Sequence, residues 1–117
     1  MRISTEKYIL DKEGNPQVEN DLGKWGKYME SAERHVAQDS VDGIKISTVF
    51  LGLDHNYGDG APVLWETMIF GGSHDQYCER YASKEGALAG HKKAVDMVKR
   101  EQKTIQSFME DSNVHRR

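Results

Sequence analysis

Two runs of the chain, 44–51 and 63–70, have the apolar pattern of strands buried in a sheet. The first alternates at its start and is continuously apolar at its end. A third run, 76–82, alternates around Tyr77, Glu79 and Tyr81 and predicts a neighbouring strand. Short extended segments are predicted before these runs, at 8–10, 17–19 and 35–38.

Two other segments carry apolar residues at steps of three and four, which is the period of a helix. The first is short, from about 22 to 32, with Asn20 or Asp21 as its N-cap. The second runs from Lys84 to about Phe108, with Ser83 as its N-cap, and the residues from Asp111 onward are expected to fray.

Successive strands with short links favour an antiparallel meander. The sequence therefore predicts an α+β fold, with an antiparallel sheet of three to five strands and one short and one long helix packed on one face. The 117 residues suit a single domain, 1–117, with frayed N-terminal and C-terminal residues. We expect one core that holds the larger apolar side chains, namely Trp25, Phe50, Trp65, Ile69 and Val98.

Composition and charge exclude several classes of protein. The net charge is −3, without the basic field that holds nucleic acid, so a nucleic-acid partner is not expected. No run approaches the ~20 apolar residues of a membrane helix, and no apolar signal core opens the chain. Cys78 is the single cysteine and cannot form an internal disulfide. These features together predict a cytoplasmic protein.

The segment 52–62 is the most distinctive loop, because it joins two apolar strands and concentrates polar side chains. One interpretation is a metal or phosphate site. The calcium-loop pattern fails, however, since Trp65 stands where the bidentate Glu belongs. A second interpretation is a wide loop whose Asp side chains cap its own amides, and a third is a contact surface for a ligand or partner. The candidate contact residues, with one strand carboxylate added, are Asp54, His55, Asn56, Tyr57, Asp59 and Glu66.

No catalytic residue, metal ligand or cofactor is predicted. The histidines lack zinc-site spacing, and no phosphate-binding glycine motif is present. Glu66 needs no explanation on the solvent face of its strand; otherwise a cross-strand pair with Arg80 or an acid–base role accounts for it. His91 lies on the apolar stripe of the long helix, which favours a hydrogen-bonded core residue, and Cys78 is expected to be a small buried side chain.

The central run from Ser47 to Gly60, continued through Glu66–Gly72, resembles a recurrent group of small phage and prophage proteins. Their core looks like "STVFLGLDHxFGxGPPLLFETMxFGG", followed by an aromatic near Tyr81 and an Ala-Gly-His triplet, here Ala89–His91. The likeness covers roughly Tyr8 to Val98, with Tyr57 in place of the usual Phe and Ala61 in place of the first Pro. What the resemblance implies is origin: a virus or integrated element, acting in the cytoplasm of a bacterial host.

Three functions are compatible with these observations. The first is a non-enzymatic binding module that inhibits host defence, by binding a host protein or by sequestering a small signalling nucleotide. The second is a small hydrolase that uses Asp54, His55 and Glu66 around one pocket. The third is a virion assembly factor.

The long helix adds an expectation about association. Its length exceeds that of any predicted strand, so its last turns, with Ile105, Phe108 and Met109, should project past the sheet. Such an apolar segment can pack on the N-terminal hairpin, on a second copy or on a host partner. A two-fold homodimer is the simplest expectation.

Overall fold

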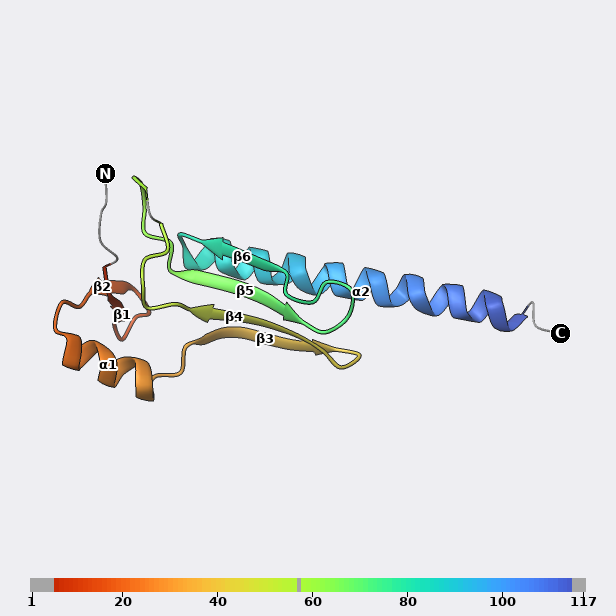
Figure 1. The fold of residues 1–117 in the computed structure, drawn as a ribbon, viewed down its shortest axis with the longest axis horizontal. Coiled ribbons are helices and arrows are strands. Elements are labelled where there is room, and N and C mark those ends of the chain that lie inside the picture. The colour runs from red at the N-terminus through yellow and green to blue at the C-terminus, as the bar shows by residue number, and fades with distance from the viewer. Residues whose placement is uncertain (1–5, 57, 115–117) are drawn as a thin grey trace.

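The computed structural model of this protein describes residues 6–56 and 58–114, which form an α+β fold (Figure 1). Four strands make one antiparallel sheet in chain order: β3 (His35–Val41), β4 (Ile44–Phe50), β5 (Trp65–Phe70) and β6 (Cys78–Tyr81). The predicted fold class is therefore confirmed.

The register of the sheet is set by its hairpin and its apolar face. Asp42 and Gly43 connect β3 to β4 with positive φ angles of 51° and 81°, which is the type I′ turn that an Asp-Gly pair favours. Between β4 and β5 the partners are Ile46 with Ile69, Thr48 with Thr67 and Phe50 with Trp65. Because side chains alternate along a strand, these three pairs share one face, and all six side chains are buried.

A small second sheet closes one end of the molecule. Its strands are β1 (Tyr8–Leu10) and β2 (Pro16–Val18), and the Tyr8 amide donates to the Gly52 carbonyl at 2.8 Å. The short helix α1 (Leu22–Ser31) follows, capped by Asp21, whose side chain accepts from the Lys24 amide. The Trp25 indole also donates to the Gly52 carbonyl, at 3.1 Å, so the hairpin and α1 both attach where β4 ends.

The long helix α2 (Lys84–Val114) lies along one face of the four-stranded sheet and extends far beyond it (Figure 1). Ser83 caps it by accepting from the Gly86 amide at 3.0 Å. The helix continues past Phe108, where the periodicity predicted its end, and reaches Val114. The expected fraying from Asp111 stays a prediction, and residues 1–5 and 115–117 lie outside the described residues.

The core consists of two clusters, and the prediction of a single core is wrong. One cluster contains Phe50 and Trp65, with Tyr8, Leu64 and Ala87. The other contains Ile69 and Val98, with Ile44, Ile46, Ala94 and Val95. Between them, along both central strands and α2, lie three buried polar residues: Thr48, Thr67 and His91. Trp25 is only half-buried and belongs to neither cluster.

The closest approach of helix and sheet generates a prediction. A Cβ added to Gly90 would collide with the ring and hydroxyl of Tyr81, whereas a Cβ at Gly26 in α1 would meet nothing within 4 Å. Gly90→Ala should therefore lower the free energy of unfolding by about 1–3 kcal/mol through overpacking. Gly26→Ala should raise it by about 0.5–1 kcal/mol through better helix propensity.

Urea denaturation of both variants beside the wild type provides the measurement. Equal stability of Gly90→Ala and wild type would contradict the described packing of α2 on β6.

Candidate functional site

The carboxylate of Asp54 organises the loop between β4 and β5. Its Oδ1 accepts from the Asn56 amide at 2.8 Å and from the Val63 amide at 2.9 Å, so it joins the two ends of the loop. Asp54 is only 1% exposed. It therefore satisfies backbone donors inside the protein instead of facing a ligand.

The rest of this loop is also held by its own contacts. Asn56 accepts from the Gly58 amide and donates to the Asp59 and Ala61 carbonyls, while the His55 ring bonds the Leu53 carbonyl at 2.9 Å. His55 and Asn56 are half-buried, and Asp59 is exposed. The interpretation of local capping by Asp side chains is confirmed for Asp54, and Asn56 caps an amide in the same way. Tyr57, also predicted as a contact residue, lies outside the described residues.

Glu66 lies on the face of the sheet that α2 does not cover. Its Oε2 accepts from Arg80 Nε at 2.8 Å across the β5–β6 pair, so the predicted cross-strand interaction is confirmed. The shallow pocket that Glu66 lines is completed by Ser47, Val49, Met68 and Phe70. Asp54 and His55 are not among its lining residues, so this pocket does not assemble the hydrolase set.

Cys78 is exposed beside Glu66, which corrects the expectation of a buried thiol. The reason is its position: paired with Met68, it faces the uncovered side of the sheet. Its Sγ donates to Glu66 Oε2 at 3.3 Å. Partial burial raises the pKa of the Cys78 thiol, the Glu66 carboxylate raises it further, and Arg80 opposes this effect.

His91 is bonded on both ring nitrogens, as expected for a core residue. Nδ1 lies 2.7 Å from Thr48 Oγ1, and Nε2 lies 2.7 Å from Asp39 Oδ2. Thr48 Oγ1 also lies 2.5 Å from Thr67 Oγ1. A hydroxyl, an imidazole and a carboxylate in series have the composition of a nucleophilic triad. Thr48 is completely buried, however, so a substrate cannot reach its hydroxyl.

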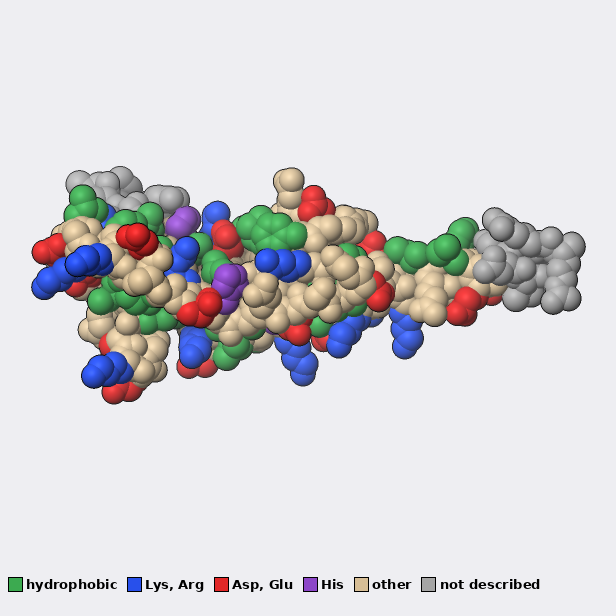
Figure 2. Space-filling view, turned by 90° about the horizontal axis from the view of Figure 1, so that it is seen from below, with side chains coloured by type: hydrophobic (Ala, Val, Ile, Leu, Met, Phe, Trp, Pro, Cys, Tyr) green, Lys and Arg blue, Asp and Glu red, His purple; other side chains and the backbone are tan. Residues whose placement is uncertain are grey.

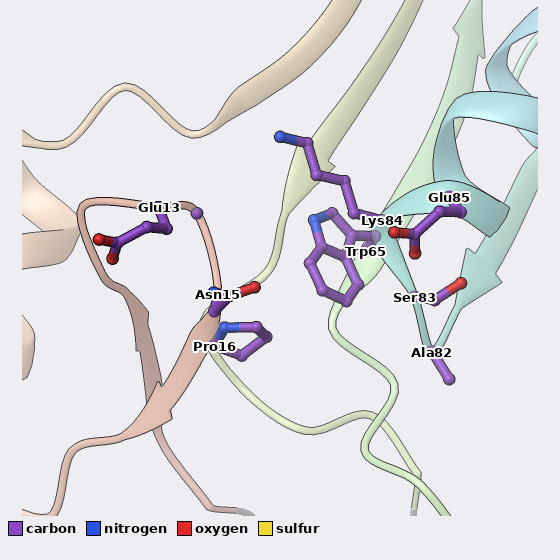
Figure 3. A pocket seen from close by; sticks show the side chains of 9 residues that line it. Glu13, Asn15, Pro16, Trp65, Ala82, Ser83, Lys84 and Glu85 are labelled. Atoms are coloured by element: carbon purple, nitrogen blue, oxygen red, sulfur yellow. The ribbon is translucent and has the colours of Figure 1, made fainter.

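A groove that the sequence did not reveal lies where the β1–β2 turn meets the start of α2 (Figure 3). The indole of Trp65 is its floor, the Glu13–Pro16 turn is one wall, and Ser83, Lys84 and Glu85 are the other. The cavity has a volume of about 430 Å³. A second cavity of about 230 Å³ shares Trp65 and Lys84 and reaches Arg34 and His35.

The end of α2 carries exposed apolar side chains. Ile105, Phe108 and Met109 are 44%, 72% and 59% exposed, and the last turns of α2 lie beyond the four-stranded sheet (Figure 1). Ser73 and His74, in the connection between β5 and β6, both contact Glu101 of α2, just before the exposed stripe. Figure 2 shows hydrophobic side chains along one edge of this segment, and both basic and acidic side chains along the other. The predicted overhang is present, and the N-terminal hairpin does not cover it.

In the described part of the chain, no cluster of three or more His, Cys, Asp or Glu side chains is placed to hold a metal ion. Neither α1 nor α2, as far as they are described, combines the length and apolar character needed to cross a bilayer. Comparison of the chain with models of protein families, with curated proteins and with solved structures gives no match.

The internal role of Asp54 leads to the second prediction. Asp54→Ala leaves the amides of Asn56 and Val63 without their acceptor in a buried site, so it should lower the free energy of unfolding by about 1–3 kcal/mol. Asp54→Asn keeps an acceptor oxygen and should recover part of the loss. Thermal and urea unfolding measure both variants. If the Asp54→Ala protein is as stable as the wild type, the structural role of Asp54 is contradicted and a contact with a ligand becomes the better explanation.

The environment of Cys78 leads to the third prediction. Because its pKa is raised, the thiol is protonated at pH 7 and should react with iodoacetamide more slowly than a free cysteine, with a rate that increases as the pH rises. Glu66→Gln removes the carboxylate that raises the pKa and should speed the reaction at fixed pH. Mass spectrometry follows the alkylation. A slower or unchanged rate in Glu66→Gln would show that Glu66 does not control this thiol.

Proposed function

We propose that this protein is a non-enzymatic binding module that inserts the end of α2 into an apolar groove of a protein partner. The observation that carries the proposal is the exposure of Ile105, Phe108 and Met109 on the part of α2 that projects beyond the sheet. Phe108, at 72% exposed, is a large apolar side chain that water solvates poorly.

The spacing of these residues supports binding by one helix face. Positions i, i+3 and i+4 lie together on a helix, and amphipathic helices that bind grooves use anchors at these steps. Lys99, Arg100 and Lys103 fall on the opposite face by the same geometry and are exposed. Asp96 and Glu110 share that face, so the charges at the border of the contact have both signs and the apolar stripe specifies the partner groove.

The small size of the stripe favours a groove over a second copy of the chain. Two crossing helices touch along one narrow contact, and each chain offers three apolar side chains there. A stable interface buries about 800 Å² on each partner. A groove encloses the helix on several sides, so it buries more surface of these three side chains than a second helix does. The predicted homodimer stays a prediction that the experiment below tests.

The loop and sheet residues support binding without catalysis. Asp54 is engaged by backbone amides, and Glu66 is paired with Arg80 in a pocket without Asp54 and His55. The resemblance to small phage proteins adds that the partner is a host protein in the bacterial cytoplasm. Inhibition of a host-defence protein is then the simplest biological role.

Site-directed photocrosslinking tests the proposal. A benzophenone amino acid is placed at Phe108, and a matched control carries it at Lys103 on the opposite face. Irradiation in bacterial cells should yield one adduct from position 108 and none from position 103. Excess wild-type protein should suppress the adduct, whereas Phe108→Glu should not; Lys103→Glu should compete like the wild type. Both competitor variants are changed at exposed positions, so their melting temperatures should equal that of the wild type.

The mass of the adduct separates the possible partners. An adduct of one chain with a different protein supports the groove contact. An adduct of two copies of this chain shows the homodimer and contradicts the groove. No adduct from position 108, or equal adducts from both positions, contradicts the proposal.

A further inference from the structure

The groove over Trp65 contains a polar group that the folded chain leaves unsatisfied. Trp65 is 3% exposed, and its indole Nε1 has no hydrogen-bond partner among the residues that the structure describes. An unmet buried donor costs about 1–3 kcal/mol, which is unusual in a well-packed protein. The other tryptophan, Trp25, shows the ordinary arrangement, because its Nε1 donates to the Gly52 carbonyl.

The unsatisfied donor faces the groove. In Figure 3 the nitrogen edge of the indole is turned toward the space between the Glu13–Pro16 turn and the Lys84 side chain, whose aliphatic part passes beside it. Lys84 is exposed and has no ion pair among the described residues. It can therefore move aside at little cost and uncover Nε1.

Several features of the groove favour a hydrogen-bond acceptor with negative charge. The indole N–H is a donor only, and Lys84 adds a cation. The groove also borders the N-terminus of α2, a helix of 31 residues whose positive end favours anions. On the opposite wall, a Cβ at Gly14 would lie 3.7 Å from Lys84 Nζ, so the lysine reaches across to the turn. That turn is held by Asp11, which accepts from the Glu13 and Asn15 amides.

The acidic residues of the same groove limit how negative a ligand can be. Glu13 and Glu85 both line the cavity and are exposed, so with Lys84 the charged side chains of this cavity sum to one negative charge. A polyphosphate would meet two carboxylates, whereas an ammonium group would be attracted to them. The groove is thus suited to a ligand with one anionic and one cationic group.

We propose that this groove binds a small amino carboxylate. Once Lys84 has moved aside, the ligand carboxylate accepts from Trp65 Nε1 and from Lys84, its ammonium group faces Glu13 and Glu85, and its apolar part packs beside Pro16. The cavity of about 430 Å³ has the size of small-molecule sites. This site is independent of the α2 overhang and argues against sequestration of a signalling nucleotide.

Nuclear magnetic resonance offers a test with an internal control. In ¹⁵N-labelled full-length protein, the two indole N–H signals are assigned with Trp25→Phe and Trp65→Phe, the latter a conservative change that keeps an aromatic ring. The probes are L-leucine, acetate, butylamine and AMP. L-Leucine should shift the Trp65 indole signal saturably and leave the Trp25 signal in place.

Variants of exposed groove residues identify which half of the ligand each residue recognises. Lys84→Met should weaken L-leucine binding by about tenfold, as should the double variant Glu13→Gln/Glu85→Gln, since about 1.4 kcal/mol is lost in each case. Lys12→Met, next to the groove residues in sequence but not among those that line the cavity, is the matched control and should bind normally.

Acetate carries only the carboxylate and butylamine only the ammonium group, so each should bind more weakly than L-leucine. The proposal is overturned if L-leucine leaves the Trp65 signal unchanged, if acetate binds as tightly as L-leucine, or if AMP binds more tightly. Since photocrosslinking from position 108 does not involve this groove, failure here leaves the helix-end contact untouched.

Discussion

The hydrogen bonds of His91 with Thr48 and Asp39 fix the long helix on the sheet. Nε2 of His91 lies 2.7 Å from Asp39 and Nδ1 lies 2.7 Å from the Thr48 hydroxyl, which also contacts the Thr67 hydroxyl, so both ring nitrogens and both hydroxyls are hydrogen-bonded. A shift of α2 by one turn, about 5.4 Å, would place the imidazole against the apolar side chains of one core cluster and leave its two ring nitrogens unpaired. At about 1–3 kcal/mol for each unpaired group, the register of the helix is strongly specified.

This register determines what lies at both ends of α2. At the N-terminal end it brings Ser83 and Lys84 beside the β1–β2 turn and forms the groove over Trp65. At the other end it determines where the sheet stops. A strand of seven residues spans about 23 Å, and 31 helical residues span about 46 Å, so the helix must project. The exposed stripe follows from this mismatch, and the longest dimension of the molecule is 68 Å.

Much of the fold could be predicted because local signals agree with the tertiary structure. The Asp42–Gly43 turn, the Asp21 and Ser83 caps and the apolar strands all form as the sequence indicates. The division of the core was missed because alternation identifies a buried face but not the chemistry of its middle layer. Cys78 was misjudged because a strand pattern does not say which face is covered.

The candidate sites were less accessible to sequence reasoning. The polar loop suggested Asp54 as a contact, yet a carboxylate beside Gly and Asn serves equally well to bind amides within its loop, and burial decided between the two. The groove brings the Glu13–Pro16 turn to Trp65 and Lys84, and residues so far apart in the chain leave no local pattern. The overhang, in contrast, followed from helix length alone.

Hydrogen–deuterium exchange along α2 tests the central claim, that the polar layer holds the first half of the helix while the last turns project without a partner in the same chain. In the intact protein at a concentration where light scattering gives a monomer, amides between Ala87 and Val98 should exchange only on global unfolding. Amides from Ile105 to Val114 should exchange far faster, as in a helix without tertiary contacts. Uniform protection along the whole of α2 in the monomer would contradict the account.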